Sequence, residues 1–245
     1  MFRFRVTAFA ALALLAAAGP AAAQAMDDAQ RRAIESVVRD YLVKNPEVIL
    51  EAIQSLQARE REQSDQQAKQ ALVANRQKLF ENPDSPVLGN PKGDVTVVEF
   101  FDYQCGYCKA VHNDVQRLVK DDGKLRFVFK EFPILGPASV TASKAALAAR
   151  GQGKYMEMHD ALMTHRGQLD DDTVYRLARS AGLDVDRLKK DMESPDVLKV
   201  IATNQALAEQ LGIRGTPGFI FGDTIVPGAI KLDEMKKLVA TVRKG

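Results

Sequence analysis

The sequence predicts an α/β domain that follows a helical N-terminal segment, and three observations support this fold class. Residues 27–80 contain no glycine and one proline, and their apolar residues recur at helical spacing. The β-branched and aromatic run VTVVEFF at 95–101 precedes a helical pattern and then a second strand-like run at 125–129. Residues 137–212 have the pattern of several helices, and the late apolar run at 213–221 follows them. Strands that alternate with helices are typical of α/β domains.

The N-terminus has the features of a cleavable signal peptide over residues 1–25. Arg3 and Arg5 precede an uncharged run at 6–18, and small residues then stand at Ala23 and Ala25. The apolar run is shorter than the about 20 residues of a membrane-spanning helix. We therefore expect export to the periplasm with cleavage after Ala25, or alternatively after Ala23, rather than an uncleaved anchor.

Residues 26–81 are predicted to form a helical stalk interrupted at Asn45-Pro46, where Asn45 would be the N-cap of a second helix. Two apolar stripes flank this break: Ile34, Val37, Val38, Tyr41 and Leu42, then Val48, Ile49, Ala52, Ile53 and Leu56. Residues 59–70 are polar on every face. Such a helix cannot bury its stripes alone, so it docks either on its own domain or on further copies of the chain. The stripes are too short to choose between a dimer and a trimer.

A segment rich in Pro, Gly, Asn and Asp at 82–94 marks the domain boundary. The main domain is expected at 82–245, with a helical insertion at about 137–212. Near its end, Asp223-Thr224 is the expected turn of a hairpin, and a last helix is expected at 232–242.

Composition excludes several functional classes. The formal net charge is +2 and no basic cluster stands out, so the charge does not support nucleic acid or membrane-surface partners. After the signal peptide no segment is apolar enough to span a membrane. Two cysteines in a chain of 245 residues are also too few for a disulfide-stapled scaffold.

Both cysteines lie in CGYC, at the turn between the first expected strand and the following helix. A cysteine at a helix N-terminus lies near unpaired backbone N–H groups and the positive end of the helix dipole, which favour its thiolate. Cys105 is therefore the expected nucleophile. Cys108, one helical turn later, is the expected resolving cysteine that breaks a mixed disulfide.

Metal binding is the competing interpretation of these cysteines. Cys105, Cys108 and His112 form C-x-x-C-x-x-x-H, but structural zinc usually needs four ligands, and His159 and His165 are distant in sequence. Haem attachment through CxxCH is excluded because a lysine follows Cys108. Cu(I) accepts two thiolates and remains open as a side activity of Cys105 and Cys108. The alternative for His112 is a histidine on the helix surface.

Taken together, VVEFFDYQCGYC, the KEFP strand and GTPGFIF resemble the DsbA-like branch of the thioredoxin-fold oxidoreductases, over about residues 86–243. The resemblance implies a thioredoxin fold with an inserted helical subdomain and no cofactor. It implies that Pro217 is cis and lies beside Cys105, and that the backbone of Thr216 pairs with an extended substrate.

The same resemblance assigns roles to two charged residues. Glu99 falls where this family keeps a buried acid beneath the disulfide, and Lys130 matches a lysine that can pair with it. A buried carboxylate near a thiol can relay protons during exchange. The alternative for Glu99 is a strand residue that faces solvent.

The dipeptide between the cysteines is Gly106-Tyr107, rather than the Pro-His of strongly oxidising members. Together with Thr216 before the proline, it is similar to the DsbC-type isomerases, which are oligomers with an N-terminal association segment. Within the DsbA-like branch, the whole chain resembles the group of suppressor-of-copper-sensitivity C proteins, which carry such a stalk. That resemblance favours a trimer over a dimer.

The expected function is thus an exported protein disulfide isomerase, with cysteine-containing substrate proteins and a redox partner protein. The alternatives are a dithiol oxidase of the DsbA type, a copper-binding or copper-tolerance thiol protein, and a stalked assembly protein in which the cysteine pair is incidental.

Overall fold

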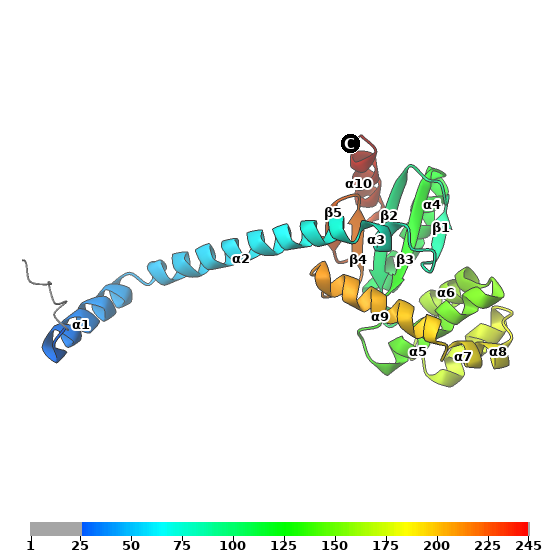
Figure 1. The fold of residues 1–245 in the computed structure, drawn as a ribbon, viewed down its shortest axis with the longest axis horizontal. Coiled ribbons are helices and arrows are strands. Elements are labelled where there is room, and N and C mark those ends of the chain that lie inside the picture. The colour runs from blue at the N-terminus through cyan, green and yellow to red at the C-terminus, as the bar shows by residue number, and fades with distance from the viewer. Residues whose placement is uncertain (1–25, 245) are drawn as a thin grey trace, which may run out of the picture. The chain divides into compact units, whose positions relative to one another are not determined.

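The computed structural model describes residues 26–244, so the expected signal peptide at 1–25 lies outside the described residues (Figure 1). The chain divides into two compact units after Ala58. Helix α2 (Glu47–Ala74) runs through this division, and each unit is described by itself. Within the described residues, no helix combines the length and the apolarity that crossing a bilayer requires.

The first unit contains α1 (Asp28–Lys44) and the beginning of α2. The side chain of Asp27 accepts hydrogen bonds from backbone N–H groups of the first turn, and the side chain of Gln30 accepts one from the backbone of Asp27. This reciprocal pair is a capping box. The break at Asn45 occurs as predicted, but Asn45 does not cap the second helix with its side chain. Its backbone N–H and its side-chain amide both donate to the carbonyl of Tyr41, so Asn45 ends α1.

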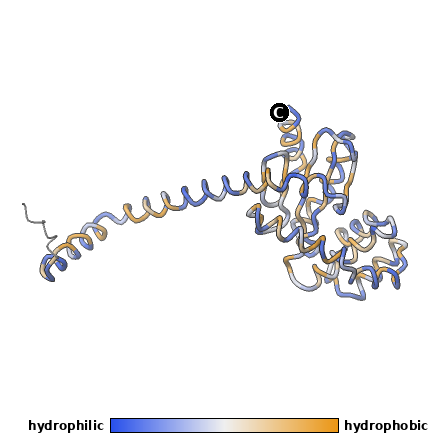
Figure 2. Tube along the Cα trace, viewed as in Figure 1, coloured by the Kyte–Doolittle hydropathy of each residue, from blue (hydrophilic) through white to orange (hydrophobic). Residues whose placement is uncertain are grey.

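Most of the large apolar side chains of the first unit are exposed. Figure 2 shows hydrophobic positions along α1 and the first turns of α2, and none of the α1 residues is buried. Exposed fractions run from 46% for Ile53 to 72% for Val43. The predicted helices are confirmed, and most residues of their apolar stripes face solvent in the single chain, whereas Leu42 and Val48 are half-buried.

A five-stranded mixed sheet forms the centre of the second unit, in the order β1-β3-β2-β4-β5. The strands are β1 (Val87–Gly89), β2 (Val95–Phe101), β3 (Leu125–Glu131), β4 (Gly218–Phe221) and β5 (Thr224–Pro227). β2 and β3 are parallel, and the other neighbours are antiparallel. The predicted strands and the hairpin are confirmed. The short β1 was not predicted, because it lies in the turn-rich boundary segment.

Helices cover both faces of this sheet. Val97 and Phe101 point into a core shared with α4 (Gly106–Asp122) and α10 (Leu232–Lys244). Alternate residues of β2 point to the other face, where they meet the end of α2, the short α3 (Arg76–Phe80) and the end of α9. This sheet, with a helix directly after β2, is the expected thioredoxin fold.

The insertion between β3 and β4 is helical, as predicted. It comprises α5 (Pro137–Ala149), the one-turn η1 (Arg150–Gln152), α6 (Tyr155–Thr164), α7 (Asp171–Ser180), α8 (Val185–Asp191) and α9 (Pro195–Gln210). Buried side chains of these helices belong to the same core as α4, so the insertion is packed onto the domain that carries the cysteines. The end of the stalk is also part of this unit, since Leu72, Leu79 and Phe80 are buried against the sheet. The domain boundary expected at 81/82 stays a prediction.

Candidate active site

Cys105 lies where the sequence places it, between β2 and α4. It is the N-cap residue of α4, with extended backbone at φ −73° and ψ 115°, and its Sγ accepts the backbone N–H of Cys108 at 3.3 Å. Cys105 retains 6% of its accessible surface, whereas Cys108 retains none. Both cysteines are free thiols in this structure. A substrate disulfide can therefore contact Cys105 but not Cys108.

The surroundings separate the acidities of the two thiols. The pKa of Cys105 is lowered to about 5, mainly by a hydrogen bond from the Cys108 side chain. Partial burial opposes this change, while further hydrogen bonds from the Thr216 side chain and from the backbone N–H groups of Cys108 and Tyr107 support it. Burial raises the pKa of Cys108 far above its ordinary value. At neutral pH Cys105 is consequently a thiolate and Cys108 a thiol.

Thr216-Pro217 meets this pair from the far end of the chain. The peptide bond between the two residues is cis, as the resemblance implied. The carbonyl oxygen of Thr216 lies 3.2 Å from Cys105 Sγ, although the two residues are 111 positions apart. A pocket of about 300 Å³ adjoins this loop, and its lining includes Thr216, Pro217 and, from α2, Ser64, Asp65 and Ala68.

Glu99 is buried on β2, with 3% of its surface accessible, so the solvent-facing alternative is wrong. It shares its sheet face with Phe101 and the cysteines. Its pKa is raised to about 8, first by burial and then by the charge of Cys105. Glu99 in turn raises the pKa of Cys108 through its own charge. The carboxyl group is thus electrostatically coupled to both thiols.

Lys130 is fully buried, but the predicted pairing with Glu99 is wrong. Phe129 is the residue of β3 in register with Glu99, so Lys130 points to the opposite face of the sheet. Its Nζ donates to the backbone carbonyl of Lys78 and to Ser85 Oγ, both at 2.7 Å. Burial lowers its pKa to about 8. Lys130 therefore joins the sheet to the end of the stalk segment rather than to the cysteines.

Asp102 is a buried residue that sequence reasoning missed. Its Oδ2 accepts the backbone N–H groups of Ile134 and Leu135 at 2.8 and 3.0 Å, and its Oδ1 accepts the hydroxyl of Ser139 at 2.7 Å. These bonds hold the entry to the helical insertion against the end of β2. The only available signal was an acid directly after a buried strand, and such a residue commonly lies in a solvated turn.

His112 was also misplaced by the sequence analysis. It is buried with 6% of its surface accessible, not on the helix surface. Within the described residues it groups with His159 and Asp160, and not with the two cysteines. The expected zinc alternative through Cys105 and Cys108 therefore gains no third ligand from it.

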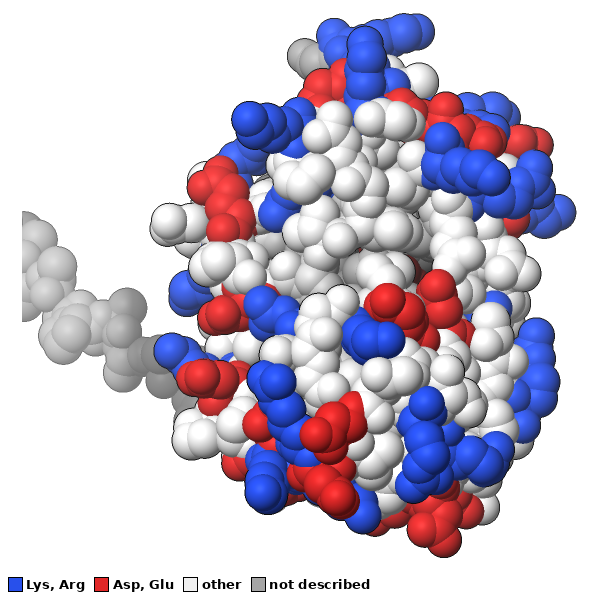
Figure 3. Space-filling view, turned by 90° about the vertical axis from the view of Figure 1, so that its right-hand side faces the viewer, with Lys and Arg blue, Asp and Glu red and all other residues white. Residues whose placement is uncertain are grey.

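Three large side chains are exposed near the end of β2 and the start of α4. Tyr107, Ile134 and Leu135 are exposed by 71%, 39% and 52%, respectively. Figure 3 shows one face of the molecule, on which acidic and basic side chains surround a recessed, uncharged area.

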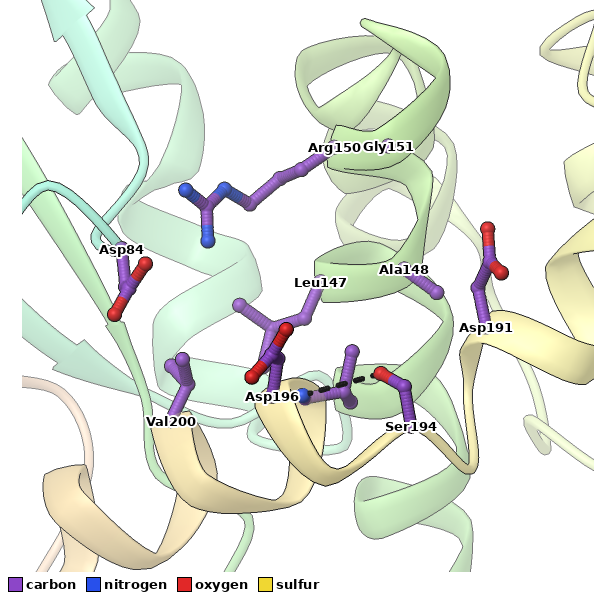
Figure 4. A pocket seen from close by; sticks show the side chains of 10 residues that line it. Asp84, Leu147, Ala148, Arg150, Gly151, Asp191, Ser194, Asp196 and Val200 are labelled. Atoms are coloured by element: carbon purple, nitrogen blue, oxygen red, sulfur yellow. Dashed lines mark hydrogen bonds between the residues drawn. The ribbon is translucent and has the colours of Figure 1, made fainter.

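A separate pocket of about 440 Å³ lies between α5 and α9 (Figure 4). Its charged lining residues are Asp84, Arg150, Asp191 and Asp196, and neither cysteine lines it.

Comparisons with known proteins agree with this geometry. The family described as DSBA-like thioredoxin domain matches residues 96–240, and the Copper resistance protein ScsC N-terminal domain family matches residues 30–63. A thioredoxin-like oxidoreductase from Silicibacter pomeroyi is 50% identical, with a TM-score of 0.69, and the alignment covers 70% of this chain and 99% of that one. Proteus mirabilis ScsC in a transitional conformation is 30% identical, with a TM-score of 0.66, over 89% of this chain and 99% of that one.

Curated relatives of this domain are longer proteins. The Na(+)/H(+) antiporter NhaA 1 of Salinispora arenicola is 30% identical over 161 residues, which are 65% of this chain and 25% of the antiporter. The chain thus spans about a quarter of the length of this curated relative.

Proposed function

This chain belongs to the DSBA-like thioredoxin domain family and is a thiol-disulfide oxidoreductase of the DsbA/ScsC type, and on that premise we propose that it is an exported protein disulfide isomerase. One observation carries the proposal: an accessible thiolate at Cys105, a buried thiol at Cys108 and the carbonyl of Thr216 meet at one point. An extended substrate that pairs with the backbone of Thr216 would present its disulfide to Cys105.

Exchange begins when the Cys105 thiolate attacks one sulfur of a substrate disulfide. The new S–S bond joins enzyme and substrate, the old one breaks, and the second substrate sulfur leaves as a thiolate. In isomerisation, this thiolate attacks another disulfide of the same substrate. A substrate thiolate finally displaces Cys105, so no electrons are gained or lost overall.

Cys108 resolves a mixed disulfide in which the substrate has not rearranged. Its thiol must lose a proton before it attacks Cys105, and Glu99 is the proposed acceptor. The charge of Cys105, which raises the pKa of Glu99, disappears in the mixed disulfide. Glu99 therefore becomes a stronger acid at that step and is more often an ionised base. This route reduces the substrate by two electrons, so a dithiol partner must then reduce the enzyme again.

The exposed stripes of α1 and α2 support self-association through residues 26–58. They carry large apolar side chains that are about half exposed or more in the single chain. We assign a trimer, following the family expectation, in which several thiolates would face one substrate. Thr216, Pro217 and Cys105 then act as the substrate-binding and reacting groups of each copy.

The test is the reactivation of scrambled ribonuclease by the reduced full chain. We expect reactivation by the parent and none by Cys105→Ser, which lacks the nucleophile. Cys108→Ala should retain part of the activity, because isomerisation does not need the resolving thiol. A folded parent that leaves ribonuclease scrambled contradicts the isomerase assignment.

A dithiol oxidase is the second candidate, and the low pKa of Cys105 favours it. A stabilised thiolate favours the reduced pair over the disulfide, which makes the disulfide a stronger oxidant. The parent chain, prepared in its disulfide form, distinguishes the oxidase from the isomerase. An oxidase in this form would oxidise reduced ribonuclease stoichiometrically. The copper-tolerance alternative would be Cu(I) held by both sulfurs, and the high pKa of the Cys108 thiol opposes the second thiolate.

A further inference from the structure

Two helices bring a second group of potential ligands together behind the cysteine pair. His112 lies on α4, one turn after Cys108, and His159 and Asp160 lie on α6, which packs against α4. The ligand atoms of these three residues all lie within 4.8 Å of one another, and we call them the histidine cluster. His112 Nε2 is 3.2 Å from Asp160 Oδ1. Two ligands about 2.0–2.1 Å from one tetrahedral ion are separated by roughly this distance.

The imidazole of His159 has an unused nitrogen. The residue is completely buried, its Nδ1 lies 3.0 Å from the hydroxyl of Tyr103, and its Nε2 has no hydrogen-bond partner among the described residues. Buried polar atoms without a partner are uncommon in proteins. When Nδ1–H donates to Tyr103, the free Nε2 carries a lone pair, which is how a metal-binding histidine is held.

Gln116, on α4, lies beside two members of the histidine cluster. Gln116 Nε2 lies 3.1 Å from His112 Nε2 and 2.7 Å from Asp160 Oδ1. With His112 Nε2 as an acceptor, the two amide N–H groups of Gln116 serve both atoms, and the ring nitrogen and the carboxylate oxygen then face each other with lone pairs at 3.2 Å. A cation between His112 and Asp160 would accept both of these lone pairs. Gln116 would support the carboxylate through its hydrogen bond to Asp160 Oδ1.

We propose that His112, His159 and Asp160 form a binding site for a divalent transition-metal ion. Two imidazoles and one carboxylate suit Zn(II) and Cu(II), whereas Mg(II) and Ca(II) prefer sets of oxygen ligands. The side chain of Asp160 is 44% exposed, so an ion has an entry path from the surface. Three protein ligands leave a coordination position for water. The site uses neither thiol, and the proposal is therefore independent of the proposed exchange activity.

The test uses the untagged full chain with its two cysteines joined as a disulfide, so that no thiolate competes for the ion. Zn(II) and Cu(II) are each titrated in competition with a chromogenic chelator at neutral pH. We expect one equivalent to bind, and the Cys105→Ser, Cys108→Ser double variant to bind it equally well. Bound Cu(II) should show nitrogen hyperfine coupling in its electron paramagnetic resonance spectrum.

Asp160→Asn and His112→Gln should each weaken binding by at least about tenfold, since even supporting residues around a metal contribute 10–100-fold. The matched controls are Asp114→Asn on α4 and His165→Asn, which changes the one histidine outside the cluster; both should bind like the parent. Asp160 is partly exposed, so its variant should unfold at the parent's midpoint in the absence of metal. Binding that survives Asp160→Asn, binding that is lost with the cysteines, or no equivalent of either ion overturns the proposal. Preference for Zn(II) or for Cu(II) supports the site and identifies its ion.

Discussion

Replacing Glu99 with glutamine tests whether a buried, mostly protonated acid lies beneath the cysteine pair. Glutamine has nearly the shape of the protonated carboxyl group but cannot ionise. The folded chain raises the pKa of Glu99 from 4.5 to about 8, mainly because burial disfavours the charged form. The substitution removes this titration and leaves the packing of β2 nearly unchanged.

The size and sign of the effect follow from linkage. Below pH 4.5 the folded and unfolded chains both hold the proton. Between 4.5 and about 8 the unfolded chain releases it while the folded chain keeps it, so the free energy of unfolding of the parent falls as pH rises. At about 1.4 kcal/mol per pH unit, this interval corresponds to roughly 5 kcal/mol. Glu99→Gln should therefore be more stable than the parent at pH 8, by up to that amount, and similar to it near pH 4.5.

The assay is urea denaturation of the reduced chains at both pH values. Comparing variant with parent cancels the other groups that titrate in this range, among them Glu131, whose pKa burial raises to about 7. The oxidised chains should show a smaller difference, because the Cys105 charge is then absent. Glu157→Gln, on the exposed side of α6, is the matched control and should show no such pH dependence. A Glu99→Gln variant that is less stable than the parent at pH 8 would refute the reasoning.

Three further predictions concern acidity, stability and assembly. The rate of Cys105 alkylation should rise with pH, with a midpoint at about pH 5. Cys108→Ala should move this midpoint upward, because the hydrogen bond from Cys108 is the largest cause of the low pKa of Cys105. An unchanged midpoint would contradict that cause. Asp102→Ala should lower the free energy of unfolding, measured by urea denaturation, by about 2–4 kcal/mol, because buried donors lose their acceptor. A loss below about 1 kcal/mol would show that these donors find other acceptors. Combined Ile49→Glu and Ile53→Glu should convert the proposed oligomer into monomers in sedimentation velocity, and an oligomer that persists would place the interface elsewhere.

The elements that carry the cysteines could be predicted closely from local pattern. The run at 95–101 forms β2 over those residues, and the helix after CGYC starts at Gly106. A β-branched run and the periodicity of the next apolar residues are properties of short windows, so no distant contact is needed to recognise them. Strand β1 was not predicted, because it has three residues and no clear alternation of apolar and polar residues.

Residue partners were harder to predict than elements. Glu99 and Lys130 are both buried, yet they face opposite sides of the sheet because β2 and β3 run in parallel with Glu99 beside Phe129. His112 gave the pattern of a helix-surface residue, but α6 covers that side of α4. Each outcome depends on register or on which helix packs where, and a single sequence does not encode these in its spacing.

By itself, the sequence determined the order of β2 to β5 and of the main helices, the turn that carries Cys105 and Cys108, and the resemblance that pointed to Pro217. Those features depend on neighbouring residues and on backbone preferences. Only the tertiary structure decided that the carbonyl of Thr216 lies beside Cys105, that Glu99 is buried and that His112 meets His159. The pKa values follow from these decisions, because desolvation and hydrogen bonding act over a few ångströms in space, whatever the separation along the chain.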